Sequence, residues 1–176
     1  IMNLKDYIRS IQDYPKKGIL FRDITTLIKD ENAFEETINQ IVECSKKFNF
    51  TKIAAIESRG FVFASAVSYI LKKPFILLRK KNKLPADVHS IDFELEYGTA
   101  TIEVHKDSIN DDDSVLIIDD LIATGGTANA AAKLIKISKG KVAAFIFVIN
   151  LFDLGGSDNL IKNNYKVESL INFPGH

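Results

Sequence analysis

The chain has 176 residues, 46% of them hydrophobic and 26% charged, which is the length and composition of one soluble domain and excludes a disordered segment. Its 23 basic and 23 acidic residues balance, so the overall charge favours neither a nucleic acid nor a membrane surface as partner. The single cysteine, Cys44, excludes an internal disulfide, and no apolar run is long enough to span a bilayer, so we expect a cytoplasmic protein.

The first half of the chain is predicted to hold two helices, then a strand and a third helix. Apolar residues at helical spacing predict an amphipathic helix over residues 3–13, which Pro15 ends, and another over residues 33–48. A short apolar run predicts a buried strand over residues 52–57, and the residues that follow, 60–71, predict a helix.

The second half alternates strands with helices around one irregular stretch. Residues 79–92 are polar, contain Pro85 and follow no regular period, so they predict a long loop of the kind that is often functional. Strands are predicted at residues 75–78, 99–104, 115–118, 141–149 and 167–171, and helices at residues 126–138 and 159–162. This order predicts an α/β fold with a central, mainly parallel sheet flanked by helices. Such sheets bind ligands at the carboxyl ends of their strands.

Residues 115–127 carry the most chemical information. An apolar strand leads to two adjacent carboxylates, Asp119 and Asp120, and a Thr-Gly-Gly-Thr turn then opens a helix. Free backbone N–H groups, permissive glycines and the helix dipole make such a turn a site for a phosphate group. Carboxylates beside it would accept hydrogen bonds from sugar hydroxyls, so the segment predicts a sugar phosphate site.

Other phosphate motifs do not match this segment. A P-loop would end in Gly-Lys-Ser/Thr, whereas Thr127 follows Gly126, and the G-x-G-x-x-G pattern of dinucleotide sites is absent. An Asp pair by itself would also be consistent with a solvated turn. The combination of strand, acid pair and glycine turn favours the sugar phosphate site.

The sequence of residues 119–127, Asp-Asp-Leu-Ile-Ala-Thr-Gly-Gly-Thr, resembles the 5-phosphoribosyl 1-pyrophosphate (PRPP) motif of the type I phosphoribosyltransferases. Five further segments are similar, in order, to those of the adenine-specific members: residues 21–24, 57–61, 79–85, 95–98 and 150–153. The resemblance implies one phosphoribosyltransferase domain over residues 3–176. It also implies a small hood, made of residues 3–32 and the C-terminal segment, and a flexible active-site loop over residues 79–98. Residues 173–176 match the family ending, and no role follows for them.

The resemblance implies that adenine and PRPP react, with Mg²⁺, to give AMP and pyrophosphate through an oxocarbenium-like transition state. Catalytic roles fall on Glu96, which would handle a proton at the purine, and on Asp119 and Asp120, which would hold the ribose hydroxyls. Mg²⁺ would be bound mainly by the substrates, with a contribution from the two aspartates and no all-protein site.

The other implied site residues group by the part of the substrates that they would bind. The 5′-phosphate would be bound by Ala123, Thr124, Gly125, Gly126 and Thr127. Pyrophosphate would be bound by Ser58, Arg59, Arg79 and Lys83. Adenine would be bound by Leu20, Phe21, Arg22 and Leu151. Tyr97 of the loop would close over the ribose or base. The resemblance further implies a homodimer in which Arg79 is contributed across the interface.

Two other functions stay open at this point. A phosphoribosyltransferase for hypoxanthine or guanine would bind a base with a carbonyl where adenine has its amino group. A PRPP-sensing regulatory protein of the same fold would need an appended DNA-binding domain or a basic face, and the balanced charge supports neither. No nucleic acid or membrane is expected as a partner.

Overall fold

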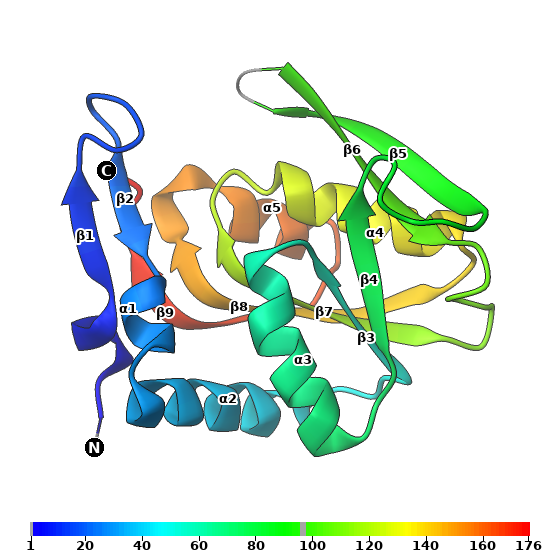
Figure 1. Ribbon diagram of the computed structural model, residues 1–176, viewed down its shortest axis with the longest axis horizontal. Helices are drawn as coiled ribbons and strands as arrows, with labels where there is room; N and C mark the ends of the chain where they lie inside the picture. Colours follow the sequence, from blue (N-terminus) through cyan, green and yellow to red (C-terminus); the bar gives the residue numbers. More distant parts are fainter. Residues whose placement is uncertain (1, 96–97) are drawn as a thin grey trace.

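The computed structural model describes residues 2–95 and 98–176, and its centre is a seven-stranded sheet of order β5-β6-β4-β3-β7-β8-β9 (Figure 1). Neighbours from β4 to β9 run parallel, and the hairpin of β5 and β6 adds an antiparallel edge beside β4. The strands are β3 (Lys52–Ile56), β4 (Phe75–Lys80), β5 (Val88–Leu95), β6 (Gly98–His105), β7 (Ser114–Ile122), β8 (Lys141–Leu151) and β9 (Val167–Phe173). The predicted α/β fold with a mainly parallel sheet is confirmed.

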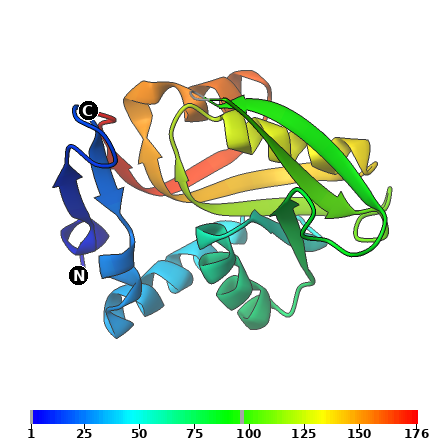
Figure 2. The same cartoon turned by 45° about the horizontal axis from the view of Figure 1, so that its top comes forward.

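Helices cover both faces of this sheet (Figure 2). On one face lie α2 (Glu31–Ser45) and α3 (Arg59–Leu71), and on the other lie α4 (Gly126–Ile137) and the shorter α5 (Gly156–Lys162). The side chain of Asp30 caps α2 by accepting a hydrogen bond from the Ala33 amide at 2.9 Å. Among residues 2–95 and 98–176, none of the helices combines the length and the hydropathy that crossing a bilayer requires.

Alternation along the strands divides the core into two apolar layers. Ile53 and Ile146 point toward α2 and α3, whereas Ala54 and Phe145 point toward α4 and α5. All four side chains are fully buried, as expected for strands covered on both faces. The central strands therefore form a rigid base from which the loops at their carboxyl ends project.

The predicted helix over residues 3–13 is wrong. The chain forms a short 3-10 helix, η1 (Leu4–Tyr7), and then the strand β1 (Arg9–Gln12), which pairs antiparallel with β2 (Leu20–Asp23) ahead of α1 (Thr25–Ile28). Leu4 and Ile8 are buried in the layer of α2 at helical spacing, and the backbone becomes extended from Ile8 onward. Tertiary contacts and the ladder to β2 override the local period.

The predicted irregular structure of residues 79–92 is also wrong over much of its length. β4 continues to Lys80, and β5 pairs along its whole length with β6, from Val88 opposite His105 to Leu95 opposite Gly98. Ile91 and Phe93 alternate with polar residues and pack against the layer of α4. This period of two is diluted by charged residues, and β5 is stabilised by pairing with the next strand of the hairpin, β6.

Candidate functional site

A cleft of about 430 Å³ lies at the carboxyl ends of the parallel strands. It is enclosed by the ends of β3 and β7, the start of α3, the turn into α4 and the end of β5. Its lining comprises Ile56, Glu57, Ser58, Arg59, Lys80, Glu94, Leu95, Phe147 and residues 119–128. The structure thus brings together the predicted phosphate turn, both aspartates, Ser58 and Arg59.

The turn of residues 123–127 ends in an exposed helix terminus. Gly125 has φ of +91°, a left-handed conformation that favours glycine, and α4 begins at the next residue. Among the described residues, no side chain caps this terminus. The side-chain amide of Asn129 donates to the Gly125 carbonyl at 2.8 Å, so it does not occupy the first amides of the helix. Thr124 is exposed, and both it and Thr127 line the cleft. The first amides of α4 are therefore available to an anion.

A second glycine, Gly156, supports this turn from behind. Its amide donates to the Ala123 carbonyl at 3.1 Å. A Cβ at position 156 would lie 2.5 Å from the Ala123 oxygen and 2.7 Å from the Gly125 nitrogen, both backbone atoms. The sequence signal is the Gly155-Gly156 pair, but a glycine pair indicates a turn without showing which segment that turn contacts. Gly156 is needed for the close approach of the two turns.

The two aspartates differ in their surroundings. Asp120 is buried, and its Oδ2 lies 2.5 Å from Nε of Arg59, whose own pKa is raised by that carboxylate. Oδ1 of Asp119 accepts a hydrogen bond from the Asp120 amide at 2.8 Å. Desolvation by the surrounding protein, and then the charge of Asp120, raise the pKa of Asp119 well above its ordinary value.

The space for the Asp119 carboxylate depends on Gly60, in the first turn of α3. A Cβ at position 60 would lie 2.8 Å from Oδ1 of Asp119 and 3.4 Å from the Ile118 carbonyl oxygen. Gly60 is part of the segment that resembles the family, but its contact with Asp119 joins two motifs that lie far apart in sequence.

The turn between β3 and α3 holds the end of β4. The peptide bond between Glu57 and Ser58 is cis, and Oε1 of Glu57 accepts a hydrogen bond from the Lys80 amide at 2.6 Å. The same oxygen lies 3.5 Å from Nε of Arg79. Arg79 and the exposed Lys83 do not themselves line the cleft, although Arg79 contacts Glu57, which does.

The residues expected to bind adenine lie outside this cleft. Leu20, Phe21 and Arg22 are half-buried on β2, and Leu151 is buried at the end of β8. The ring of Phe21 contacts that of Tyr14 edge to face at 5.1 Å between centroids. Two further expected residues, Glu96 and Tyr97, lie outside the described part of the chain, whereas their neighbours Glu94 and Leu95 line the cleft.

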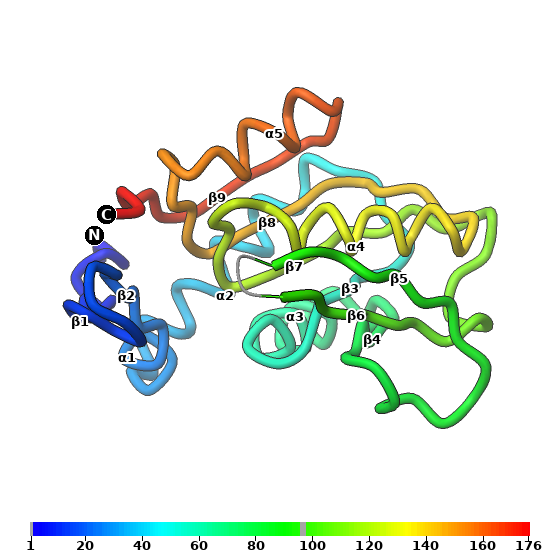
Figure 3. Tube along the Cα trace, turned by 90° about the horizontal axis from the view of Figure 1, so that it is seen from above, coloured from blue at the N-terminus to red at the C-terminus, as the bar shows by residue number. Residues whose placement is uncertain are grey.

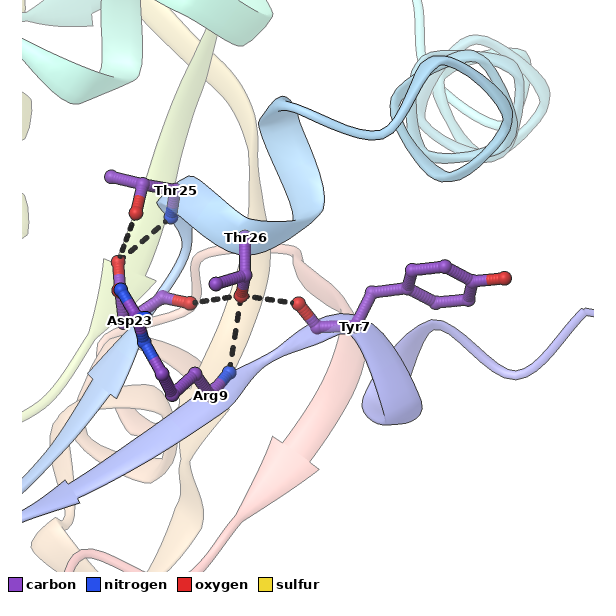
Figure 4. Close-up of polar contacts among 5 residues, drawn as sticks. All are labelled: Tyr7, Arg9, Asp23, Thr25 and Thr26. Carbon is purple, nitrogen blue, oxygen red and sulfur yellow. Dashed lines mark hydrogen bonds and ion pairs between the residues drawn. The ribbon is translucent and has the colours of Figure 1, made fainter.

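The end of β2 is fixed by Asp23, whose polar contacts are drawn in Figure 4. Its carboxylate accepts hydrogen bonds from the hydroxyl and the amide of Thr25, at 2.6 and 2.9 Å, and pairs with Arg9 at 2.5 Å. These bonds, led by that of the Thr25 hydroxyl, lower the pKa of Asp23 to about 2. Thr26 adds a bond from its hydroxyl to the Tyr7 carbonyl. The predicted base segment is thereby anchored at its carboxyl end.

Asp119 and Asp120 are two adjacent carboxylates that the cleft offers to a hard cation such as Mg²⁺, and Glu57 and Glu94 also line it. Among residues 2–95 and 98–176, no group of three or more His, Cys, Asp or Glu side chains is arranged to hold a metal. The donor set fits a cation that takes the rest of its ligands from substrate and water.

Comparisons with known proteins agree on one family. Residues 24–173 match the family described as "Phosphoribosyl transferase domain". Adenine phosphoribosyltransferase of Pelagibacter ubique (strain HTCC1062) is 81% identical over 175 residues, which cover 99% of this chain and 100% of that protein.

Two solved structures are similar over nearly the whole chain. Adenine phosphoribosyltransferase from Thermoanaerobacter pseudethanolicus has a TM-score of 0.92 at 44% identity and covers 97% of this chain and 98% of its own. The enzyme from Giardia lamblia, complexed with 9-deazaadenine, has a TM-score of 0.91 at 32% identity, with coverages of 98% and 99%.

Proposed function

The chain belongs to the phosphoribosyltransferase family, among its adenine-specific enzymes, and from this premise we propose how its cleft makes AMP and pyrophosphate from adenine and PRPP. The observation that carries the proposal is the uncapped start of α4 beside Asp119 and Asp120 in one cleft. The reaction breaks the bond between C1 of the ribose and the pyrophosphate oxygen. A purine nitrogen then bonds to C1 and gives up its proton.

The ribose 5-phosphate half of PRPP binds along β7 and the turn into α4. The amides and hydroxyls of residues 123–127 hold the 5′-phosphate, helped by the positive end of the helix dipole. Asp119 and Asp120 accept hydrogen bonds from the ribose hydroxyls and stabilise the positive charge that develops on the ring. Arg59 lowers the cost of placing two carboxylates side by side.

Pyrophosphate is bound at the start of α3 by Ser58 and Arg59. Arg79 and Lys83 add positive charge from a second chain, because neither side chain lines the cleft of its own chain. Mg²⁺, when bound, neutralises charge on the leaving pyrophosphate, and Asp119 and Asp120 contribute to holding it.

Adenine is bound by the backbone of residues 20–22, with Phe21, Arg22 and Leu151 beside it. Glu96 handles the proton that the purine gives up, and Tyr97 closes over the ribose or base. The complex of the Giardia lamblia enzyme with 9-deazaadenine supports a base site of this kind.

The active form is a homodimer. Three apolar side chains on the outer face of α3 are exposed, Val62, Tyr69 and Ile70, and Tyr69 is 85% exposed. Leu77, 40% exposed, is two residues from Arg79 on β4, so both side chains lie on the same face of this strand. A second copy that covers this apolar patch would therefore approach Arg79 directly.

The single Cys44 supports a reducing compartment, the cytoplasm.

One assay tests this function. The full chain is mixed with PRPP and equal concentrations of adenine, hypoxanthine and guanine, with and without Mg²⁺, and the nucleotides and pyrophosphate are measured. We expect AMP and pyrophosphate in equal amounts, and only with Mg²⁺. IMP or GMP as the main product would support the other purine specificities, and PRPP binding without release of pyrophosphate would support the regulatory protein.

A further inference from the structure

The side chain of Arg22 is engaged by the C-terminal end of the chain. Its guanidinium carbon lies 4.4 Å from the centre of the Phe173 ring, and Nη2 donates to the Pro174 carbonyl at 3.2 Å. On the other side, Nη1 donates to the Ser10 hydroxyl of β1 at 2.6 Å. Nε is buried without a hydrogen-bond partner, so the guanidinium is held by the ring and two oxygens.

The C-terminal residues are themselves fixed to the segment that follows β8. Phe173 is the register partner of Leu151 in the parallel pair of β8 and β9. The Gly175 amide donates to Oδ1 of Asp153 at 2.5 Å, and a Cβ at position 175 would lie 2.5 Å from Cγ of Leu154. Figures 1 and 3 show this end of the chain beside β2, on the N-terminal side of the molecule.

We propose that residues 173–175 and the Arg22 side chain form a clamp that positions the two halves of the base site, β2 and the end of β8. The residues of this clamp are Arg22, Phe173, Pro174 and Gly175. The three C-terminal residues act through Arg22, Phe21 and Leu151, which lie beside the base, rather than on the reacting atoms. The proposal rests on the proposed function, because it takes residues 20–22 and 151 as the walls of the adenine site.

The contacts explain why a clamp is needed at this place. β2 belongs to a two-stranded sheet that is separate from the central sheet, and its end is anchored through Asp23 to Arg9, Thr25 and Thr26, which all belong to the N-terminal segment. Leu151 belongs to the central sheet. Arg22, stacked on Phe173, joins the two sheets directly at the residues that face each other across the base site.

The clamp does not reach the PRPP half of the cleft. None of its four residues lines the cleft that contains Asp119, Asp120 and the turn of residues 123–127. Loosening it therefore changes the binding of the base and leaves the binding of PRPP in place. A general loss of folding would change both.

The test is a steady-state comparison of four variants with the unmodified chain: Phe173→Leu, Arg22→Lys, a chain that ends at Phe173, and Phe173→Tyr. The first three variants weaken the clamp, and we expect each to raise KM for adenine by about tenfold. This is the change in affinity expected when a cation–π contact and its hydrogen bond are lost. KM for PRPP should stay within about twofold, since its binding groups are untouched. Phe173→Tyr keeps an aromatic face and should retain the KM for adenine of the unmodified chain.

Lys5→Ala is the matched control. The Lys5 ammonium also lies over the Phe173 ring, at 5.0 Å, but Lys5 is not on β2. Its removal should leave both KM values unchanged. Thermal melting of every variant checks that it is folded at the assay temperature.

The outcomes separate this inference from the proposed function. No AMP formation by the unmodified chain would overturn the proposed function and the clamp with it. An active unmodified chain whose clamp variants keep the original KM for adenine, or lose adenine and PRPP binding equally, would overturn the clamp alone.

Discussion

At the scale of single residues, the cleft depends on two glycines that contribute no side chain. Gly60 leaves room for the Asp119 carboxylate, and Gly156 lets the turn before α5 touch the phosphate turn. They differ in what a methyl group would meet, because Asp119 offers a movable side chain and the phosphate turn offers backbone. The two substitutions should therefore have different effects.

Gly60→Ala is expected to lower kcat by about ten- to 100-fold, since a small displacement of a catalytic group is enough for a loss of this size. The new Cβ would lie 2.8 Å from Oδ1 of Asp119, and that oxygen can rotate away. Alanine also favours a helix over glycine, so the melting temperature should not fall. Rate measurements beside melting curves check this, and an unchanged kcat would show that the position of Asp119 does not matter.

Gly156→Ala is expected to raise KM for PRPP by about tenfold, the effect of weakening one charge-assisted hydrogen bond to the phosphate. The backbone atoms of Ala123 and Gly125 must move, because the Cβ would lie 2.5 and 2.7 Å from them. Ser157→Ala, at the adjacent position, adds no atoms and serves as control. Equal KM values for the two variants would contradict the role of Gly156.

Asp23 gives a pH dependence of stability whose sign follows from its pKa. The folded state lowers this pKa from 3.8 to about 2, so the carboxylate stabilises the protein above pH of about 4, and this contribution is lost as the pH falls toward 2. Asp23→Asn should therefore lower the free energy of unfolding by about 1–2 kcal/mol at pH 7 and by less near pH 3. Urea denaturation at both pH values measures the difference in the free energy of unfolding between the variant and the unmodified chain. A larger difference at pH 3 than at pH 7 would contradict the prediction.

At the scale of elements, the sequence predicts a helix or strand well where its hydrophobic pattern matches the burial of that element in the fold. The continuous apolar runs that become β3, β7 and β8 can be read directly, because both faces of these strands are covered. The glycines predict the turn before α4, and the small and apolar residues that alternate after them predict the helix itself. These elements supply much of the lining of the cleft.

The elements that sequence reasoning misses are stabilised by pairing with a neighbouring strand rather than by a strong pattern of their own. β1 depends on pairing with β2, and β5 depends on β6, so neither has a sufficient local signal. The same holds for site residues: the contact of Gly156 with Ala123 and the stacking of Arg22 on Phe173 join segments that are far apart in sequence. A single sequence gives the residue types but not these contacts.

At the scale of the whole molecule, one chain leaves an apolar patch exposed, and Arg79 does not line the cleft of its own chain. Tyr69→Glu should therefore convert a dimer into a monomer and lower kcat by about tenfold or more, through loss of charge stabilisation by Arg79. Light scattering coupled to gel filtration measures the mass. Ile161→Glu, at a similarly exposed apolar residue of α5, is the control and should stay dimeric. A monomeric unmodified chain with full activity would contradict the dimer.

The central claim concerns the turn of residues 123–127 and is tested most directly by a crystal structure of the complex with PRPP and Mg²⁺. We predict that the 5′-phosphate oxygens lie about 3 Å from the amides of Gly126 and Thr127, with the ribose hydroxyls against Asp119 and Asp120. A 5′-phosphate bound anywhere else, with the start of α4 in contact with solvent alone, would contradict the account.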